Sequence, residues 1–80
     1  MNAIEQAIKE AVEKGGYEIT FDHEHEYKHG SYGRFLLDPS FWQALGKAKG
    51  WNIGTVEINW HRLIDHLAEG KDAESFFAAL

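Results

Sequence analysis

The chain has 80 residues, a net charge of −5 at pH 7 and no cysteine, and 44% of its residues are hydrophobic. The lack of cysteine excludes disulfides, iron–sulfur clusters, thiolate zinc sites and cysteine nucleophiles. The length allows a single domain, 1–80, and no apolar run approaches the roughly 20 residues that span a bilayer. Because the N-terminus also lacks the pattern of a secretory signal, we expect a small cytoplasmic protein with no membrane contact. The acidic balance argues against binding nucleic acid by neutralising phosphates.

The first predicted element is an amphipathic helix over residues 2–14. Asn2 followed by Glu5 has the pattern of a capping box, and Gly15-Gly16 predicts the end of the helix. Apolar residues recur at helical spacing between these signals: Ile4, Ala7, Ile8, Ala11 and Val12.

Residues 17–37 predict the β part of the fold. Tyr17, Ile19 and Phe21 alternate with polar residues, which is the period of a half-buried strand. A glycine-bearing turn is expected at 28–33, and residues 34–37 are expected to return as a second strand. Such a hairpin is marginal alone, so it needs helices packed on its apolar face.

Three further helices are predicted in the second half of the chain. Asp38-Pro39 begins one that runs to about residue 49, because Asp caps a helix and Pro suits its first position. Thr55 is expected to cap a helix over 56–68, with a short strand over 56–60 as the alternative. Asp72 is expected to cap a short last helix.

The predicted fold is therefore α+β, with three to four short helices packed with a short β-hairpin or strand region. The alternative is an all-α fold in which 17–37 is an irregular loop. The expected core consists of Ile8, Val12, Phe41, Leu45, Trp60, Leu63, Ile64 and Leu67.

Two segments carry a resemblance to known proteins: LDPSFWQALGKAKGW at 37–51 and WHRLIDHLAEGKDAESFF at 60–77. Together they resemble short uncharacterised bacterial proteins that often occur in phage-like or mobile-element settings. The resemblance covers the C-terminal half and implies a fold and a genomic setting. It implies no activity, ligand or functional residue.

The histidines give the clearest candidate for a metal site. His23 and His25 share one face of the predicted strand, about 7 Å apart, so both imidazoles could ligate one divalent metal such as zinc. His29 follows closely and is the third candidate ligand. Glu57, His61 and Asp65 form a second set along one helix side, where a solvated polar face is the simpler interpretation.

No serine lies in a nucleophile elbow or in an interpretable triad, so the sequence predicts no enzyme. The aromatic content favours another role, because neighbouring rings on a helix point about 100° apart and some should reach the surface. The candidate interface residues are Phe41, Trp42, Trp51, Phe76 and Phe77.

The expected function is therefore a non-enzymatic accessory protein of phage or mobile-element origin that binds a protein partner or a second copy. Two alternatives remain open. One is a divalent-metal-binding domain built on the histidines. The other is an acidic mimic of nucleic acid, because residues 1–29 carry seven acids against three lysines.

Overall fold

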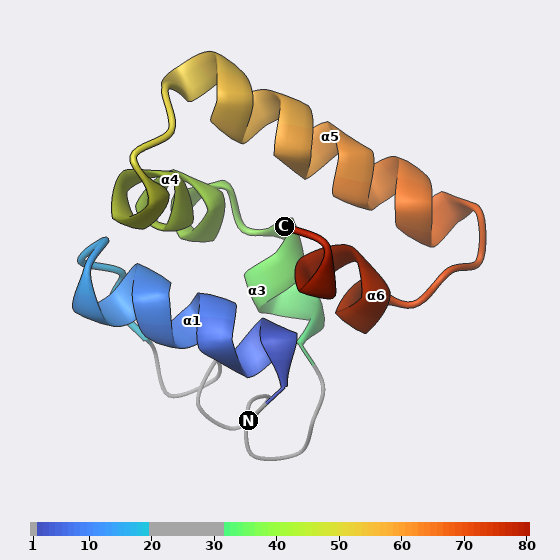
Figure 1. The fold of residues 1–80 in the computed structure, drawn as a ribbon, viewed down its shortest axis with the longest axis horizontal. Coiled ribbons are helices and arrows are strands. Elements are labelled where there is room, and N and C mark those ends of the chain that lie inside the picture. Colours follow the sequence, from blue (N-terminus) through green and yellow to red (C-terminus); the bar gives the residue numbers. More distant parts are fainter. Residues whose placement is uncertain (1, 20–31) are drawn as a thin grey trace.

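The computed structural model describes residues 2–19 and 32–80, and all regular structure in these ranges is helical. The helices are α1 (Ala3–Glu13), α3 (Gly33–Leu37), α4 (Pro39–Lys49), α5 (Ile53–Ala68) and α6 (Ala73–Ala78). Figure 1 shows α1 and α5 along opposite edges, with α3, α4 and α6 between them. Because α4 packs against α1, α3 and α5, it is the central helix of the described part.

The α+β prediction is wrong, and the all-α alternative fits the structure. Residues 34–37 form α3 instead of a second strand, and residues 17–19 pair with no strand in the described part of the chain. The reason lies in Phe35 and Leu36, which are adjacent and both buried. A strand would point them to opposite faces, whereas a helical turn packed on α4 buries both. The rest of the predicted hairpin, 20–31, lies outside the described residues.

Polar side chains begin four of the helices, and three of these caps are the ones that the sequence pattern predicts. The carboxylate or amide oxygen of each cap accepts a backbone N–H from the first turn, at 2.7–2.9 Å. The capping residues are Asn2, Asp38, Asn52 and Asp72. One start differs from prediction: α5 begins at Ile53, because the Asn52 side chain takes the cap that we assigned to Thr55.

Aromatic rings fill the centre of the fold around α4. The ring centroids of Phe41 and Trp42 lie 5.8 Å apart, and the Phe77 ring stacks on Trp42 at 5.5 Å. On the other side, Tyr17 and Phe35 pack against Phe41 at 5.7 and 6.2 Å. The indole N–H of Trp42 donates to the Leu36 carbonyl at 2.8 Å, so this buried donor is satisfied.

Two glycines allow the helices to approach α4 closely. Gly15 lies where a Cβ would overlap the carbonyl oxygen of Ala44, so α1 and α4 meet there backbone to backbone. Gly46 lies where a Cβ would overlap a methyl group of Val56, so α5 rests directly on α4. This close packing explains a glycine inside α4, where it lowers helix propensity.

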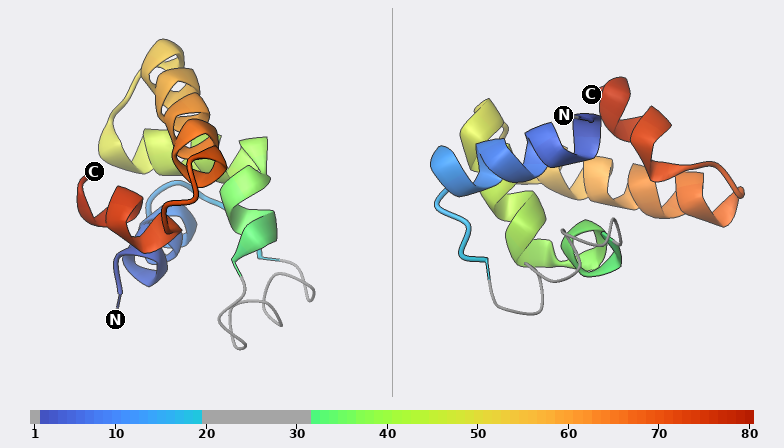
Figure 2. Two further views of the ribbon diagram at one scale, coloured as in Figure 1. Left: turned by 90° about the vertical axis from the view of Figure 1, so that its right-hand side faces the viewer. Right: turned by 90° about the horizontal axis from the view of Figure 1, so that it is seen from below.

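The two ends of the described chain are tied together. The Glu74 carboxylate in α6 accepts the backbone N–H groups of Ala3 and Ile4, at 2.8 and 3.4 Å. These amides have no partner within α1, and the carboxylate also suits the positive end of the helix dipole. Figure 2 shows α6 beside the start of α1 from two further sides.

Candidate functional site

An apolar stripe on α5 is the most distinctive surface feature of the described residues. Ile53, Trp60 and Leu67 repeat every seven residues, and Ile64 lies one turn beyond Trp60. The exposed fractions are 65% for Ile53, 37% for Ile64 and 36% for Leu67, while Trp60 is half-buried. We call these four residues the α5 stripe.

The stripe lies beside the buried side of α5 and is distinct from it. Val56 and Leu63, also seven residues apart, face the core and are 6% and 0% exposed. The apolar arc of α5 is therefore wider than the arc that α4 and α6 cover. We expected Ile64 and Leu67 in the core; the structure places both at the surface.

A shallow cleft of about 80 Å³ lies between the stripe and α4. Its wall on α4 includes Pro39 and Gln43, and its wall on α5 includes Ile53, Glu57 and Trp60. The space is too small for a drug-sized ligand, which usually needs at least about 300 Å³. It is better suited to one side chain from a macromolecular partner.

Trp60 at this cleft has an unusual polar group. Its indole Nε1 is buried and has no hydrogen-bond acceptor among the described residues. An unsatisfied buried donor costs about 1–3 kcal/mol. In contrast to Trp42, Trp60 therefore contributes ring packing alone.

The candidate interface residues chosen from the sequence lie mainly inside the fold. Phe41, Trp42 and Phe77 are 0%, 1% and 5% exposed, so these rings contribute almost no surface. Trp51 and Phe76 are half-buried and pack against the core. Trp51 also lies under the ammonium of Lys49, at 6.0 Å from the ring centroid.

The predicted metal ligands cannot be placed. His23, His25 and His29 lie outside the described residues, so the zinc hypothesis stays a prediction. Glu57, His61 and Asp65 are exposed along α5, as expected for a solvated face. Among residues 2–19 and 32–80, no group of three or more His, Asp or Glu side chains is placed to hold a metal ion.

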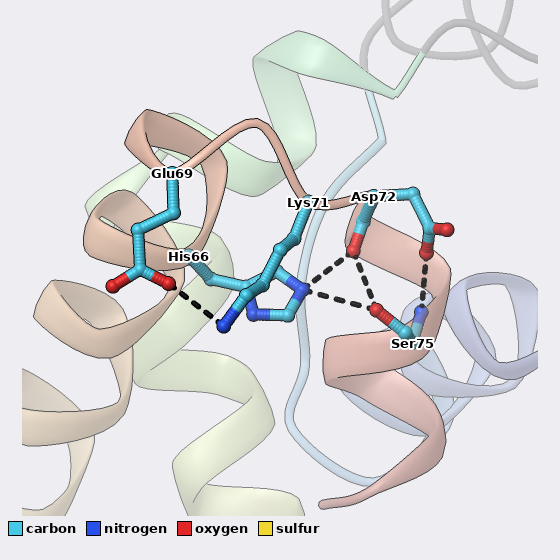
Figure 3. Close-up of polar contacts among 5 residues, drawn as sticks. All are labelled: His66, Glu69, Lys71, Asp72 and Ser75. Atoms are coloured by element: carbon cyan, nitrogen blue, oxygen red, sulfur yellow. Dashed lines mark hydrogen bonds and ion pairs between the residues drawn. The ribbon is translucent and has the colours of Figure 1, made fainter.

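A histidine and a serine meet where α5 joins α6 (Figure 3). His66 Nε2 lies 2.7 Å from the carbonyl oxygen of Asp72 and 3.0 Å from the Ser75 hydroxyl, which donates to the same carbonyl at 2.9 Å. The hydroxyl proton is thus directed at a backbone oxygen instead of the imidazole. The Ser75 amide, donating to the Asp72 carboxylate, lowers the pKa of that carboxyl.

His66, Asp72 and Ser75 form a structural link between α5 and α6. Glu69 and Lys71 form an exposed ion pair beside it at 2.8 Å, and the His66 ring packs against Phe76 at 5.6 Å. The meeting of His66 and Ser75 could not be predicted from the sequence, because it depends on the turn at Gly70, where φ is +81°. The contact fixes the angle between α5 and α6.

A depression of about 490 Å³, open to solvent, lies between α4 and the segment that follows α1. Three of its polar residues, Tyr17, Asp38 and Ser40, already serve the fold. The Tyr17 hydroxyl donates to Asp38 at 2.7 Å, and the same carboxylate caps α4 through Ser40. Burial, followed by the hydrogen bond to the Asp38 carboxylate and by its charge, raises the pKa of Tyr17 well above its usual value.

We expect this tyrosine to make the fold sensitive to alkali. Because its pKa is raised in the folded state, its stabilising effect is complete below about pH 10 and is lost as the pH rises further. Stability should fall by about 1 kcal/mol per pH unit above 10 relative to Tyr17→Phe. Urea unfolding of both proteins at pH 8, 10 and 11 measures this difference, and parallel pH profiles would contradict it.

Acidic side chains on α1 are partly engaged within the fold. Glu10 forms an ion pair with Lys49 at 3.1 Å, which lowers the pKa of the carboxyl. Glu5 accepts a hydrogen bond from the Tyr32 hydroxyl at 3.2 Å. The acidic-mimic hypothesis stays a prediction that this geometry does not favour.

None of the described helices combines the length and hydrophobicity that a bilayer crossing requires. Comparisons with family models, curated proteins and solved structures gave no match for this chain.

Proposed function

We propose that this chain is a non-enzymatic protein–protein interaction module that binds its partner through the α5 stripe. The observation that supports this is a row of apolar side chains that reach the surface of a helix whose other side already holds the core, with the exposed Glu57 beside them. Single exposed apolar residues are ordinary on protein surfaces, but a continuous row of them is typical of a binding surface.

The engagement of the polar groups supports the non-enzymatic part of the proposal. In the described residues, Ser75 and His66 join two helices, and Asp38 caps α4 while accepting from Tyr17. The cytoplasmic location and the mobile-element origin belong to the same proposal. The latter is supported by the resemblance of segments 37–51 and 60–77.

Site-specific photo-cross-linking tests this function. Benzoylphenylalanine replaces Ile64 in one variant and Ile58 in the control, since Ile58 is on the same helix, is 52% exposed and lies outside the stripe. In the cells that produce the protein, irradiation should yield a discrete covalent protein adduct from position 64 and none from position 58. Equal adducts from both positions, or none from either, would contradict the proposal.

A further inference from the structure

We draw no further inference here: the strongest candidate, the apolar stripe along the exposed side of α5, belongs to the site already described, and nothing in the structure shows what covers it.

Discussion

Replacement of Gly15 by alanine is expected to lower the free energy of unfolding by about 3 kcal/mol or more, the largest effect we predict for a single methyl group. The added Cβ would overlap the Ala44 carbonyl oxygen and lie 2.6 Å from its carbon and 2.8 Å from the Ala11 carbonyl oxygen. All three atoms belong to helical backbone, so a rotamer change cannot relieve the overlap. α1 and α4 must separate, and the packing between them is lost.

Gly16→Ala is the matched control for this prediction. Gly16 has a φ of +73° and open space around it, so alanine there costs only the strained backbone conformation, about 1–2 kcal/mol. Urea unfolding followed by circular dichroism gives both free energies. Equal losses in the two variants would show that α1 and α4 do not meet at Gly15 as described.

The second large effect is expected for Trp42→Phe, at about 2–3 kcal/mol. Trp42 is 1% exposed, and its N–H satisfies the Leu36 carbonyl. Phenylalanine leaves that carbonyl without its partner and creates a small cavity at the centre of the ring cluster. The measurement is again the free energy of unfolding in urea.

Trp60→Phe, the same substitution on α5, provides the comparison. It removes an indole N–H that has no acceptor among the described residues, so we expect a loss below about 1 kcal/mol. A loss at Trp60 as large as that at Trp42 would mean that the Trp60 N–H has a partner. The lack of an acceptor for the Trp60 N–H among the described residues would then be contradicted.

Local signals in the sequence were sufficient to predict most of the helices. Asn2, Asp38 and Asp72 cap the helices that we assigned to them, because a short polar side chain and the following amides are close in sequence. These features depend on a few neighbouring residues, which is why the sequence reveals them.

The β prediction failed because alternation is a local pattern that tertiary packing can override. The alternation of apolar and polar residues that begins at Tyr17 has the period of a strand. The Tyr17 ring nevertheless packs against Phe35 and Phe41, and its hydroxyl donates to Asp38. These partners are distant from Tyr17 in the chain, and the position of α4 determines where Phe41 and Asp38 lie. Of the alternating residues that the structure describes, Tyr17 is buried and Ile19 is 42% exposed, so the pattern does not form a strand in this part of the chain.

The α5 stripe was missed for a related reason. Periodicity shows which residues of a helix are apolar, but it does not show how wide an arc the neighbouring helices cover. Ile64 and Leu67 follow the helical pattern of Leu63 and were therefore predicted to be buried with it. Conversely, Phe41 and Trp42 are adjacent and both buried, because the central position of α4 gives it neighbours on several sides.

The isoleucine methyl groups offer the most direct test of the account, since the six isoleucines occupy positions of very different exposure. Methyl NMR with a soluble paramagnetic agent reports the exposure of each. In dilute protein, Ile53, Ile58 and Ile64 should be strongly broadened, while Ile4 and Ile8, at 5% and 3% exposed, should be protected. Protection of Ile64 in dilute protein would contradict the exposed stripe.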